Sequence, residues 1–239
     1  MSESTYMGGE LELFARAEHW KQYWISRLRP RIHGAILEVG AGLGGNTLRL
    51  RTGDERRWVC LEPDARLAAT LRETLAASPT GGAVEVRVGT LAALEPAEVF
   101  DCILYIDVLE HIEDDRAELR RAASHLTPGG QLIVLSPAHN WLFSPFDHAI
   151  GHHRRYTART LAALAPPELR LANSFYLDSV GLLASAANRF LLRQSLPGAR
   201  QIRWWDNYMV PCSRLLDPIT GGCVGKSVVA IWERRPLDF

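Results

Sequence analysis

The stretch ILEVGAGLGGNTLRL, residues 36–50, decides the fold because it encodes a strand, a loop and a helix in direct succession. An apolar run ends at the glycines of positions 40, 42, 44 and 45, and a helix-like segment follows. The glycines satisfy the G-x-G-x-x-G pattern, which is typical of loops that bind a dinucleotide. Glu38 argues against a dinucleotide, because a carboxylate just below the loop repels a pyrophosphate and favours a ligand that brings positive charge.

The alternation of strand and helix recurs along the chain. Strand-like apolar runs are expected at residues 34–40, 56–64, 83–90, 100–109 and 130–138, with helices at 65–77 and 114–126. Runs that are apolar throughout are typical of a parallel sheet that is covered on both faces. The pattern therefore predicts a doubly wound α/β sheet, whose ligands bind beyond the carboxyl ends of the strands.

Length and composition limit the class of protein. The chain has 239 residues, which suits one α/β domain with additions. Because 27 basic residues balance 27 acidic ones, bulk charge does not favour nucleic-acid binding. Lys21 and Lys226 are the only lysines, and the sequence assigns them no mechanism. We expect no signal peptide and no membrane span, and Cys60 and Cys102 fall in predicted buried strands, so we predict a cytoplasmic location.

Four segments occur in the order ILEVGAGLGGNT, LEPD, FDCILYIDVLEHIEDD and LTPGGQLIVLSP. Together they resemble the class I S-adenosylmethionine (SAM)-dependent methyltransferases over residues 34–138. The segments FARAEHWKQYW and GHHRRYT, on either side of this region, resemble a bacterial branch of the family. The resemblance implies a Rossmann-like, mostly parallel seven-stranded sheet with an N-terminal helical lid and helical additions near the C-terminus. SAM suits Glu38, since it carries an ammonium and a sulfonium and no phosphate.

The resemblance also divides the chain, as a single domain of residues 1–239, into parts. These are an N-terminal helix or lid (10–29), the SAM-binding core (34–138), acceptor-side additions (139–224) and a last strand (225–235). The additions include an amphipathic helix expected at 179–193. We expect this helix to cover the sheet edge and the acceptor pocket, and peripheral membrane contact is the alternative.

The resemblance implies a cofactor site at the ends of the first four strands and on the N-terminal helix. Its members are Trp20, Glu38, Gly40, Ala41, Gly42, Gly44, Glu62, Pro63, Thr90, Leu91, Asp107 and Val108. Glu38, the loop and Asp107 would lie at the methionine part, and Glu62 would bind the ribose. Thr90 stands where relatives often have an acid that contacts the adenine, so a hydroxyl or the backbone of Leu91 would take that contact.

Two aromatic segments leave alternatives open. Trp20, Tyr23 and Trp24 have the i, i+3, i+4 spacing of a helix stripe, which predicts either ordinary core or a lid over the cofactor. Residues 139–157 are rich in aromatic side chains that can stack on an acceptor, Tyr156 among them. We expect this segment to shape the acceptor pocket.

Histidines in the same segment are candidates for a general base, because histidine accepts protons near neutral pH. The candidates are His148, His152 and His139. The spacing of these histidines and His153 matches no structural zinc site, so no metal is predicted. Arg154 and Arg155 are interpreted as a solvated pair, as partners of acids, or as an anchor for an anionic acceptor.

The predicted function is SAM-dependent methylation of a small-molecule acceptor, at oxygen before nitrogen or carbon. The absence of a basic stripe argues against a nucleic-acid acceptor. Two alternatives stay open at this point: an oxidoreductase with a nicotinamide cofactor, against which Glu38 is the main objection, and a regulatory protein that binds SAM without turnover.

Overall fold

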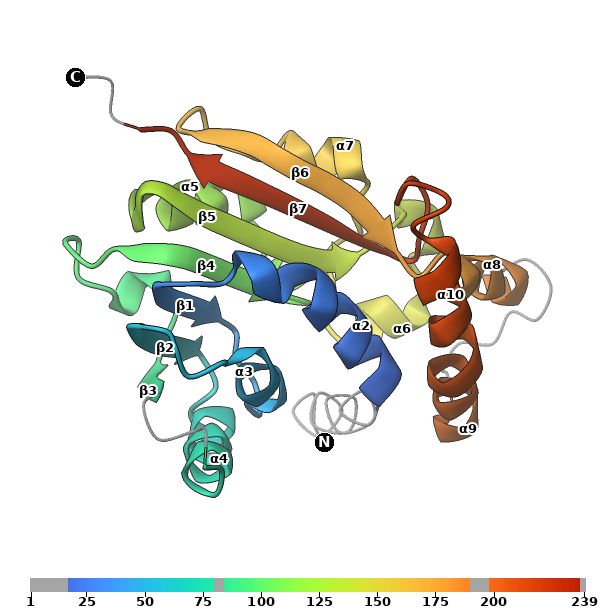
Figure 1. The fold of residues 1–239 in the computed structure, drawn as a ribbon, viewed down its shortest axis with the longest axis horizontal. Helices are drawn as coiled ribbons and strands as arrows, with labels where there is room; N and C mark the ends of the chain where they lie inside the picture. Colours follow the sequence, from blue (N-terminus) through green and yellow to red (C-terminus); the bar gives the residue numbers. More distant parts are fainter. Residues whose placement is uncertain (1–16, 80–83, 190–197, 237–239) are drawn as a thin grey trace.

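The computed structural model describes residues 17–79, 84–189 and 198–236. Within these residues, seven strands form one sheet in the order β3-β2-β1-β4-β5-β7-β6 (Figure 1). Neighbouring strands are parallel except at β7, which lies antiparallel between β5 and β6. The mostly parallel sheet that the sequence predicts is confirmed.

Each strand lies close to an apolar run of the sequence. The strands are β1 (Ala35–Val39), β2 (Arg57–Glu62), β3 (Val84–Val88), β4 (Phe100–Ile106), β5 (Leu126–Pro137), β6 (Leu169–Leu177) and β7 (Ser227–Arg234). β5 begins earlier than expected, because Leu126 pairs with Phe100 before a register shift between Phe100 and Cys102. Parallel β1, β2, β4 and β5 place their carboxyl ends at one edge, where the loops of the site gather.

Helices connect and flank these strands. The α-helices are α2 (Glu18–Leu28), α3 (Gly45–Leu50), α4 (Ala65–Ala76), α5 (Asp115–Ser124), α6 (Pro145–Ala149), α7 (Ala158–Ala162), α8 (Ser179–Ala187), α9 (Ala199–Trp204) and α10 (Val210–Leu216). The short turns are η1 (Arg29–Arg31), η2 (Leu91–Ala93), η3 (Leu109–His111), η4 (Asn140–Leu142) and η6 (Trp205–Met209). The helix expected at 179–193 ends as α8 at Ala187, and positions 190–193 lie outside the described residues.

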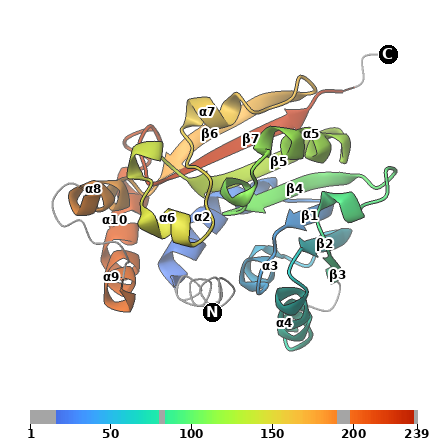
Figure 2. The ribbon, with the colours of Figure 1, turned by 180° about the vertical axis from the view of Figure 1, so that it is seen from behind.

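Helices cover both faces of the sheet, as continuous apolar strands require. On the face toward the viewer in Figure 1, α2 and α3 pack on the strands through Trp24 and Leu50, and Val210 of α10, at the end of the sheet, joins the same apolar cluster. On the opposite face, which Figure 2 shows, α5 and α7 pack through Leu119 and Leu161. Two apolar layers therefore hold the sheet and leave its carboxyl edge to the loops.

The stripe of α2 is largely core. The side chains of Tyr23 and Trp24 are 3% and 1% exposed, and the Tyr23 hydroxyl donates to Asp217 at 2.8 Å. The backbone N–H of Trp20 donates to Asp206 at 2.8 Å, which ties the start of α2 to η6. The structure thus supports the core interpretation for Tyr23 and Trp24. The first part of the predicted lid, 10–16, lies outside the described residues, and closure over a cofactor stays a prediction.

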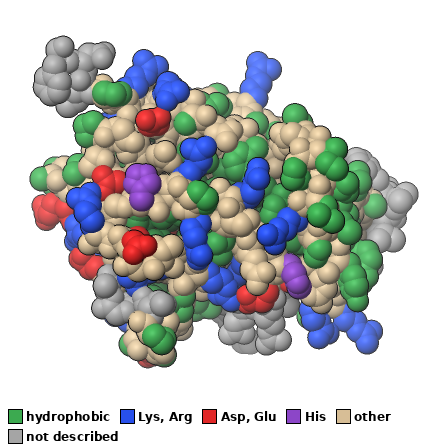
Figure 3. All heavy atoms as spheres, viewed as in Figure 1, with side chains coloured by type: hydrophobic (Ala, Val, Ile, Leu, Met, Phe, Trp, Pro, Cys, Tyr) green, Lys and Arg blue, Asp and Glu red, His purple; other side chains and the backbone are tan. Residues whose placement is uncertain are grey.

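The surface carries charges of both signs and has one apolar region. Basic and acidic side chains are interspersed on the face in Figure 3, where hydrophobic side chains gather over α8 and α10. Leu183, Leu215 and Ile219 contribute to this region and are 70%, 74% and 80% exposed. Among the described residues, the helices are too short or too polar to cross a membrane. Peripheral membrane contact stays a prediction.

Candidate cofactor and acceptor site

The loop between β1 and α3 can be built only with glycine at key positions. Gly40, Gly42 and Gly44 have φ angles of 67°, 55° and 79°, which favour glycine. A Cβ atom on Gly40 would lie 2.7 Å from Val108, and one on Gly44 would lie 2.4 Å from Leu71. The loop is therefore held tightly between η3 and α4.

Glu62, at the end of β2, holds this loop in place. Its carboxylate accepts the N–H of Gly42 at 2.8 Å and the N–H of Asp64 at 3.0 Å, and the residue is 5% exposed. A carboxylate has about four acceptor positions, so two protein donors leave room for further hydroxyl donors. The position therefore suits the predicted ribose contact, and the structure adds a loop-holding role that the sequence analysis missed.

Glu38, in β1, is 2% exposed and bonded within the protein. It accepts the Thr47 hydroxyl at 2.7 Å and the Trp58 indole N–H at 3.1 Å. Burial raises the pKa of Glu38 to about 7, and these hydrogen bonds limit the rise. Glu38 thus ties α3 to β2 beneath the loop, and its contact with a methionine group stays a prediction.

The expected adenine side lies between β2 and η2. Gly89, after β3, donates its N–H to the Glu62 carbonyl at 3.0 Å and so holds the two strand ends together. Thr90 precedes η2 and is exposed, whereas the Leu91 side chain is 1% exposed within the core. A cofactor contact by Leu91 therefore has to involve its backbone. Pro63 is exposed, and Asp64 caps α4 by accepting the N–H groups of two following residues.

Three strained residues mark the carboxyl edge. Asp107, His139 and Asp178 have φ angles of 55°, 65° and 67°, although none is glycine. They follow the ends of β4, β5 and β6, which run in the same direction. Backbone strain of this kind costs on the order of 1–3 kcal/mol per residue and clusters at functional sites. The edge where an acceptor is expected is thus also the edge where strain is stored.

Two lysines lie near this edge, Lys21, which is 9% exposed, and Lys226, which is partly buried. Desolvation by the surrounding protein raises the pKa of Asp107 to about 6, although water reaches its side chain, and the charges of Lys226 and Lys21 limit the rise. The ammonium group of Lys226 lies 4.3 Å from the centre of the Trp205 ring, in a cation–π contact. A signal was available: Lys226 lies at the start of the last predicted strand (225–235), and the antiparallel strand β7 starts at this edge.

His139 is one of the three predicted bases, and its surroundings fix its ring. The ring stacks on Tyr176 with centroids 5.2 Å apart and an angle of 8° between the planes. Its Nε2 lies 3.0 Å from the Gly225 carbonyl, which can only accept a hydrogen bond, so Nε2 carries the proton of the neutral ring. Burial lowers the pKa of His139, which favours that neutral ring. Nδ1 is then unprotonated and can act as a base.

His152 and His148, the other predicted bases, differ in their surroundings. The His152 side chain is 7% exposed, with Nδ1 2.9 Å from Asp147 and Nε2 3.8 Å from Glu110. His148, on α6, is exposed. The structure thus separates the three histidines into a stacked one, a buried one and an exposed one.

The last residues of the GHHRRYT segment bind other parts of the protein and stabilise the fold. Arg155 pairs with Asp147 at 2.7 Å, and Arg154 pairs with Asp115 at 2.6 Å. Of the three interpretations of these arginines, the one as partners of acids therefore fits the structure. Tyr156 is 3% exposed, and its hydroxyl donates to Asp115 at 2.8 Å. The expectation that Tyr156 stacks on an acceptor is therefore wrong, because the residue belongs to the core. Trp141 is 45% exposed beside His139.

Comparisons with known proteins agree with this geometry. Residues 37–132 match a family model described as a methyltransferase domain. The ubiquinone biosynthesis O-methyltransferase of Bradyrhizobium sp. (strain ORS 278) is 38% identical over 58 residues, which are 24% of this chain and 23% of the relative. The same enzyme of Albidiferax ferrireducens is 32% identical over 110 residues, 45% of this chain and 42% of the relative. The chain thus matches less than half the length of these relatives.

The fold comparison covers the whole chain. A solved complex of the Haloferax volcanii Trm112 methyltransferase activator and a putative methyltransferase includes a chain with a TM-score of 0.66 and 16% identity, over 98% of both chains. At that identity the likeness shows the fold alone. Together with the family match, it identifies a class I SAM-dependent methyltransferase domain with a Rossmann-like fold.

This domain class implies SAM as the methyl donor. Two groups around the glycine loop are compatible with such a ligand, since Glu62 has acceptor positions left for hydroxyl donors and the exposed carboxylate of Asp107 can accept from an ammonium. A pyrophosphate at the same place would be repelled by the negative charge of these carboxylates. The family match and the charge of the site therefore agree against the nicotinamide alternative.

Proposed function

We propose that this protein transfers a methyl group from SAM to an oxygen atom of a small-molecule acceptor. The observation that carries the proposal is the set of carboxylates around the glycine loop, because a cationic donor with ribose hydroxyls complements them. The O-methyltransferase relatives support oxygen as the accepting atom.

The cofactor contacts that we propose follow the order of the strands. Glu62 binds the ribose while it holds Gly42, and Asp107 together with the Gly40 loop faces the methionine part. Thr90 and the Leu91 backbone lie toward the adenine. Two further contacts complete the proposal: Pro63 beside the adenine, and Trp20 at the start of α2 as a cover.

SAM, when bound, supplies a methyl group that its sulfonium already activates, so the protein mainly aligns the acceptor and removes its proton. Among the three predicted bases, we favour His139, because its unprotonated Nδ1 belongs to a ring that Tyr176 and Gly225 hold at the strained end of β5. A neutral histidine in a fixed orientation can accept the hydroxyl proton as the acceptor oxygen reacts.

Incubation of the purified chain with methyl-labelled SAM and a panel of phenols, carboxylic acids and amines tests this function. Mass spectrometry should find the label on an oxygen atom of a product, together with one demethylated cofactor per product. Saturable SAM binding without transfer to any member of a broad panel would favour the regulatory alternative. Calorimetric binding of a nicotinamide cofactor, with none of SAM, would contradict the proposal.

A further inference from the structure

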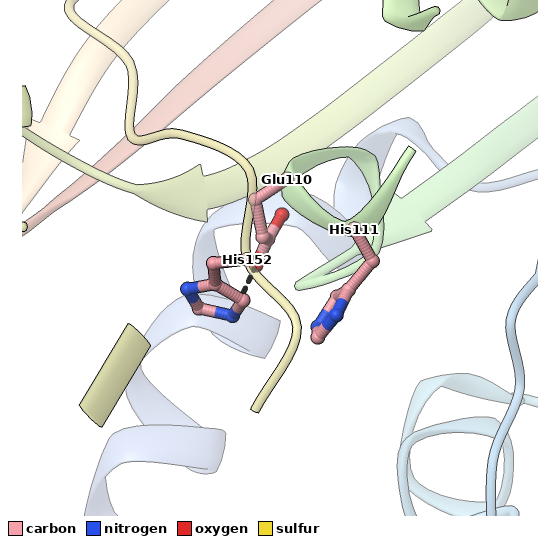
Figure 4. Close-up of side chains that lie close together, drawn as sticks. All are labelled: Glu110, His111 and His152. Atoms are coloured by element: carbon pink, nitrogen blue, oxygen red, sulfur yellow. Dashed lines mark ion pairs between the residues drawn. The ribbon is translucent and has the colours of Figure 1, made fainter. Parts of the chain in front are cut away.

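A buried carboxylate and two imidazoles meet behind the end of β4. Glu110 and His111 belong to η3, and His152 comes from the segment after α6, so two distant parts of the chain supply the cluster (Figure 4). One oxygen or ring nitrogen of each residue lies within 4.8 Å of the others. Glu110 is 0% exposed and the two histidines lie nearer the surface, so the cluster offers one buried oxygen and two nitrogen ligands.

The tautomer of His152 is determined by its neighbours. Asp147 accepts two hydrogen bonds from Arg155, at 2.7 and 2.9 Å, and a carboxylate paired with a guanidinium is ionised and can only accept. Nδ1 of His152, 2.9 Å from Asp147, therefore carries the proton. Nε2 of the neutral ring is then a lone pair, and Figure 4 shows it directed toward Glu110.

Glu110 offers the opposing atom. Its Oε2 accepts the Ser136 hydroxyl at 2.8 Å, whereas its Oε1 has no hydrogen-bond partner among the described residues. Oε1 lies 3.8 Å from Nε2 of His152, which is too far for a hydrogen bond. Oε1 of Glu110 and Nε2 of His152 thus face each other across a gap, and a buried carboxyl oxygen without a hydrogen-bond partner calls for an explanation such as an ion.

We propose that Glu110, His111 and His152 bind a divalent transition-metal ion, of which Zn²⁺ is the reference. Oxygen and nitrogen ligands about 2.1 Å from a tetrahedral Zn²⁺ lie roughly 3.4 Å apart, so the 3.8 Å gap between Glu110 and His152 needs a small closure, and His111 has to approach from within 4.8 Å. The Asp147 carboxylate supplies the outer hydrogen bond that orients a ligating histidine. Two imidazoles with one carboxylate favour such an ion over Mg²⁺ or Ca²⁺.

Three protein ligands leave at least one coordination position open, as in catalytic rather than structural sites. Glu110 lies three positions beyond Asp107 in the chain and within range of its charge, so the ion would lie near the acceptor edge. Such an ion would make an acceptor hydroxyl more acidic. His139 would take the proton as that O–H bond breaks, and the oxygen would form a C–O bond as the C–S bond of the donor breaks. This role rests on the proposed function, whereas ion binding does not.

No metal was predicted from the sequence, because the candidates were the histidines between 139 and 153. Their mutual spacing still matches no zinc pattern, and only His152 of that group takes part. Glu110 lies just before the helix expected at 114–126, and Asp114 caps α5 by accepting the N–H of Ala117 at 2.9 Å. The cluster depends on a tertiary approach over 42 positions, which spacing along the chain does not reveal.

Calorimetric titration of the untagged full chain with Zn²⁺, without SAM or acceptor, tests the site independently of the proposed function. We expect one ion per chain, visible absorption bands when Co²⁺ replaces it, and Kd values raised roughly 100-fold or more in Glu110→Gln and His152→Ala. Asp147→Asn should raise Kd about 10- to 100-fold through the outer hydrogen bond. His153→Ala removes an adjacent exposed imidazole and is the matched control, with unchanged affinity.

Thermal unfolding of each metal-free variant shows whether it is folded, and Glu110→Gln keeps the size of the side chain and an acceptor for Ser136. Retained one-to-one binding in Glu110→Gln and His152→Ala would overturn the site, because other histidines or cysteines would then hold the ion. Absence of saturable Zn²⁺ binding by the folded parent chain would overturn it as well. Loss of binding in His153→Ala would move the ion to the surface and contradict the proposal.

Discussion

Replacing Glu62 by glutamine tests whether the carboxylate that holds the glycine loop also holds the cofactor. Glu62 accepts the N–H groups of Gly42 at 2.8 Å and Asp64 at 3.0 Å while almost fully buried. Glutamine keeps the volume but turns one acceptor oxygen into an NH₂ group. One of the two backbone donors then loses its partner, and the ribose hydroxyls lose a charged acceptor.

The expected loss follows from the hydrogen bonds involved. Hydrogen bonds to a charged group contribute about 1.5–3 kcal/mol each, and glutamine retains part of one. We therefore expect SAM to bind about 1–3 kcal/mol more weakly, a rise in Kd of about 5- to 150-fold. Isothermal titration with SAM and its demethylated product measures this change, and urea unfolding measures the accompanying loss of stability.

Glu55→Gln is a matched control at the opposite end of β2. Glu55 accepts the N–H groups of Thr52 at 2.7 Å and Gly53 at 3.1 Å, so its replacement disturbs a similar loop far from the carboxyl edge. Its Kd for SAM should equal that of the parent chain. Normal SAM affinity in a folded Glu62→Gln protein, or an equal loss in Glu55→Gln, would refute the reasoning.

Three further changes probe the acceptor side, the buried acid and the first helix. His139→Ala should lower turnover roughly 10²-fold and change the free energy of SAM binding by less than about 0.5 kcal/mol. His148→Ala, which replaces an exposed histidine, should keep the turnover of the parent chain. Equal turnover in the two variants would show that His139 is not the base. The pKa of Glu38 is about 7 in the folded protein and 4.5 as the ordinary value, so between these pH values the folded state binds a proton that the unfolded state has lost. The free energy of unfolding should therefore fall by on the order of 3 kcal/mol as the pH rises from 4.5 past 7. Glu38→Gln should flatten that dependence in urea unfolding, and an unchanged slope would contradict the assignment. Tyr23→Phe should cost about 1 kcal/mol through the lost bond to Asp217. Hydrogen exchange of α2 that slows when SAM is added would support a lid, and equal exchange with and without SAM would support core alone.

The inner strands β1, β2, β4 and β5 could be predicted from the sequence because burial on both faces leaves a local, nearly unbroken apolar run. The glycine loop could also be predicted, because the positive φ angles at positions 40, 42 and 44 restrict the residue type to glycine. Glu62 was placed by its position at a strand end. Its bond to the Gly42 N–H could not be predicted, since it depends on the register between β1 and β2.

The acceptor side was harder to predict because its residues meet only through the fold. Asp178 follows β6 and Lys226 precedes β7, and the two approach because Leu177 pairs with Ser227 across these antiparallel strands. Tyr156 was assigned to an acceptor from its type alone. Its partner Asp115 is 41 positions away, and nothing local signals that bond.

The position of β7 has a consequence for how the chain is made. β7 follows β6 in the sequence but lies between β5 and β6 in the sheet. Until β7 has been synthesised, the edge of β5 has no partner, and Leu132 and Val134, which are 0% exposed in the finished protein, lie beside an open row of backbone groups. An unpaired apolar strand invites pairing with another chain. The growing protein is therefore most prone to aggregation just before the strand that brings Lys226 to the site is added.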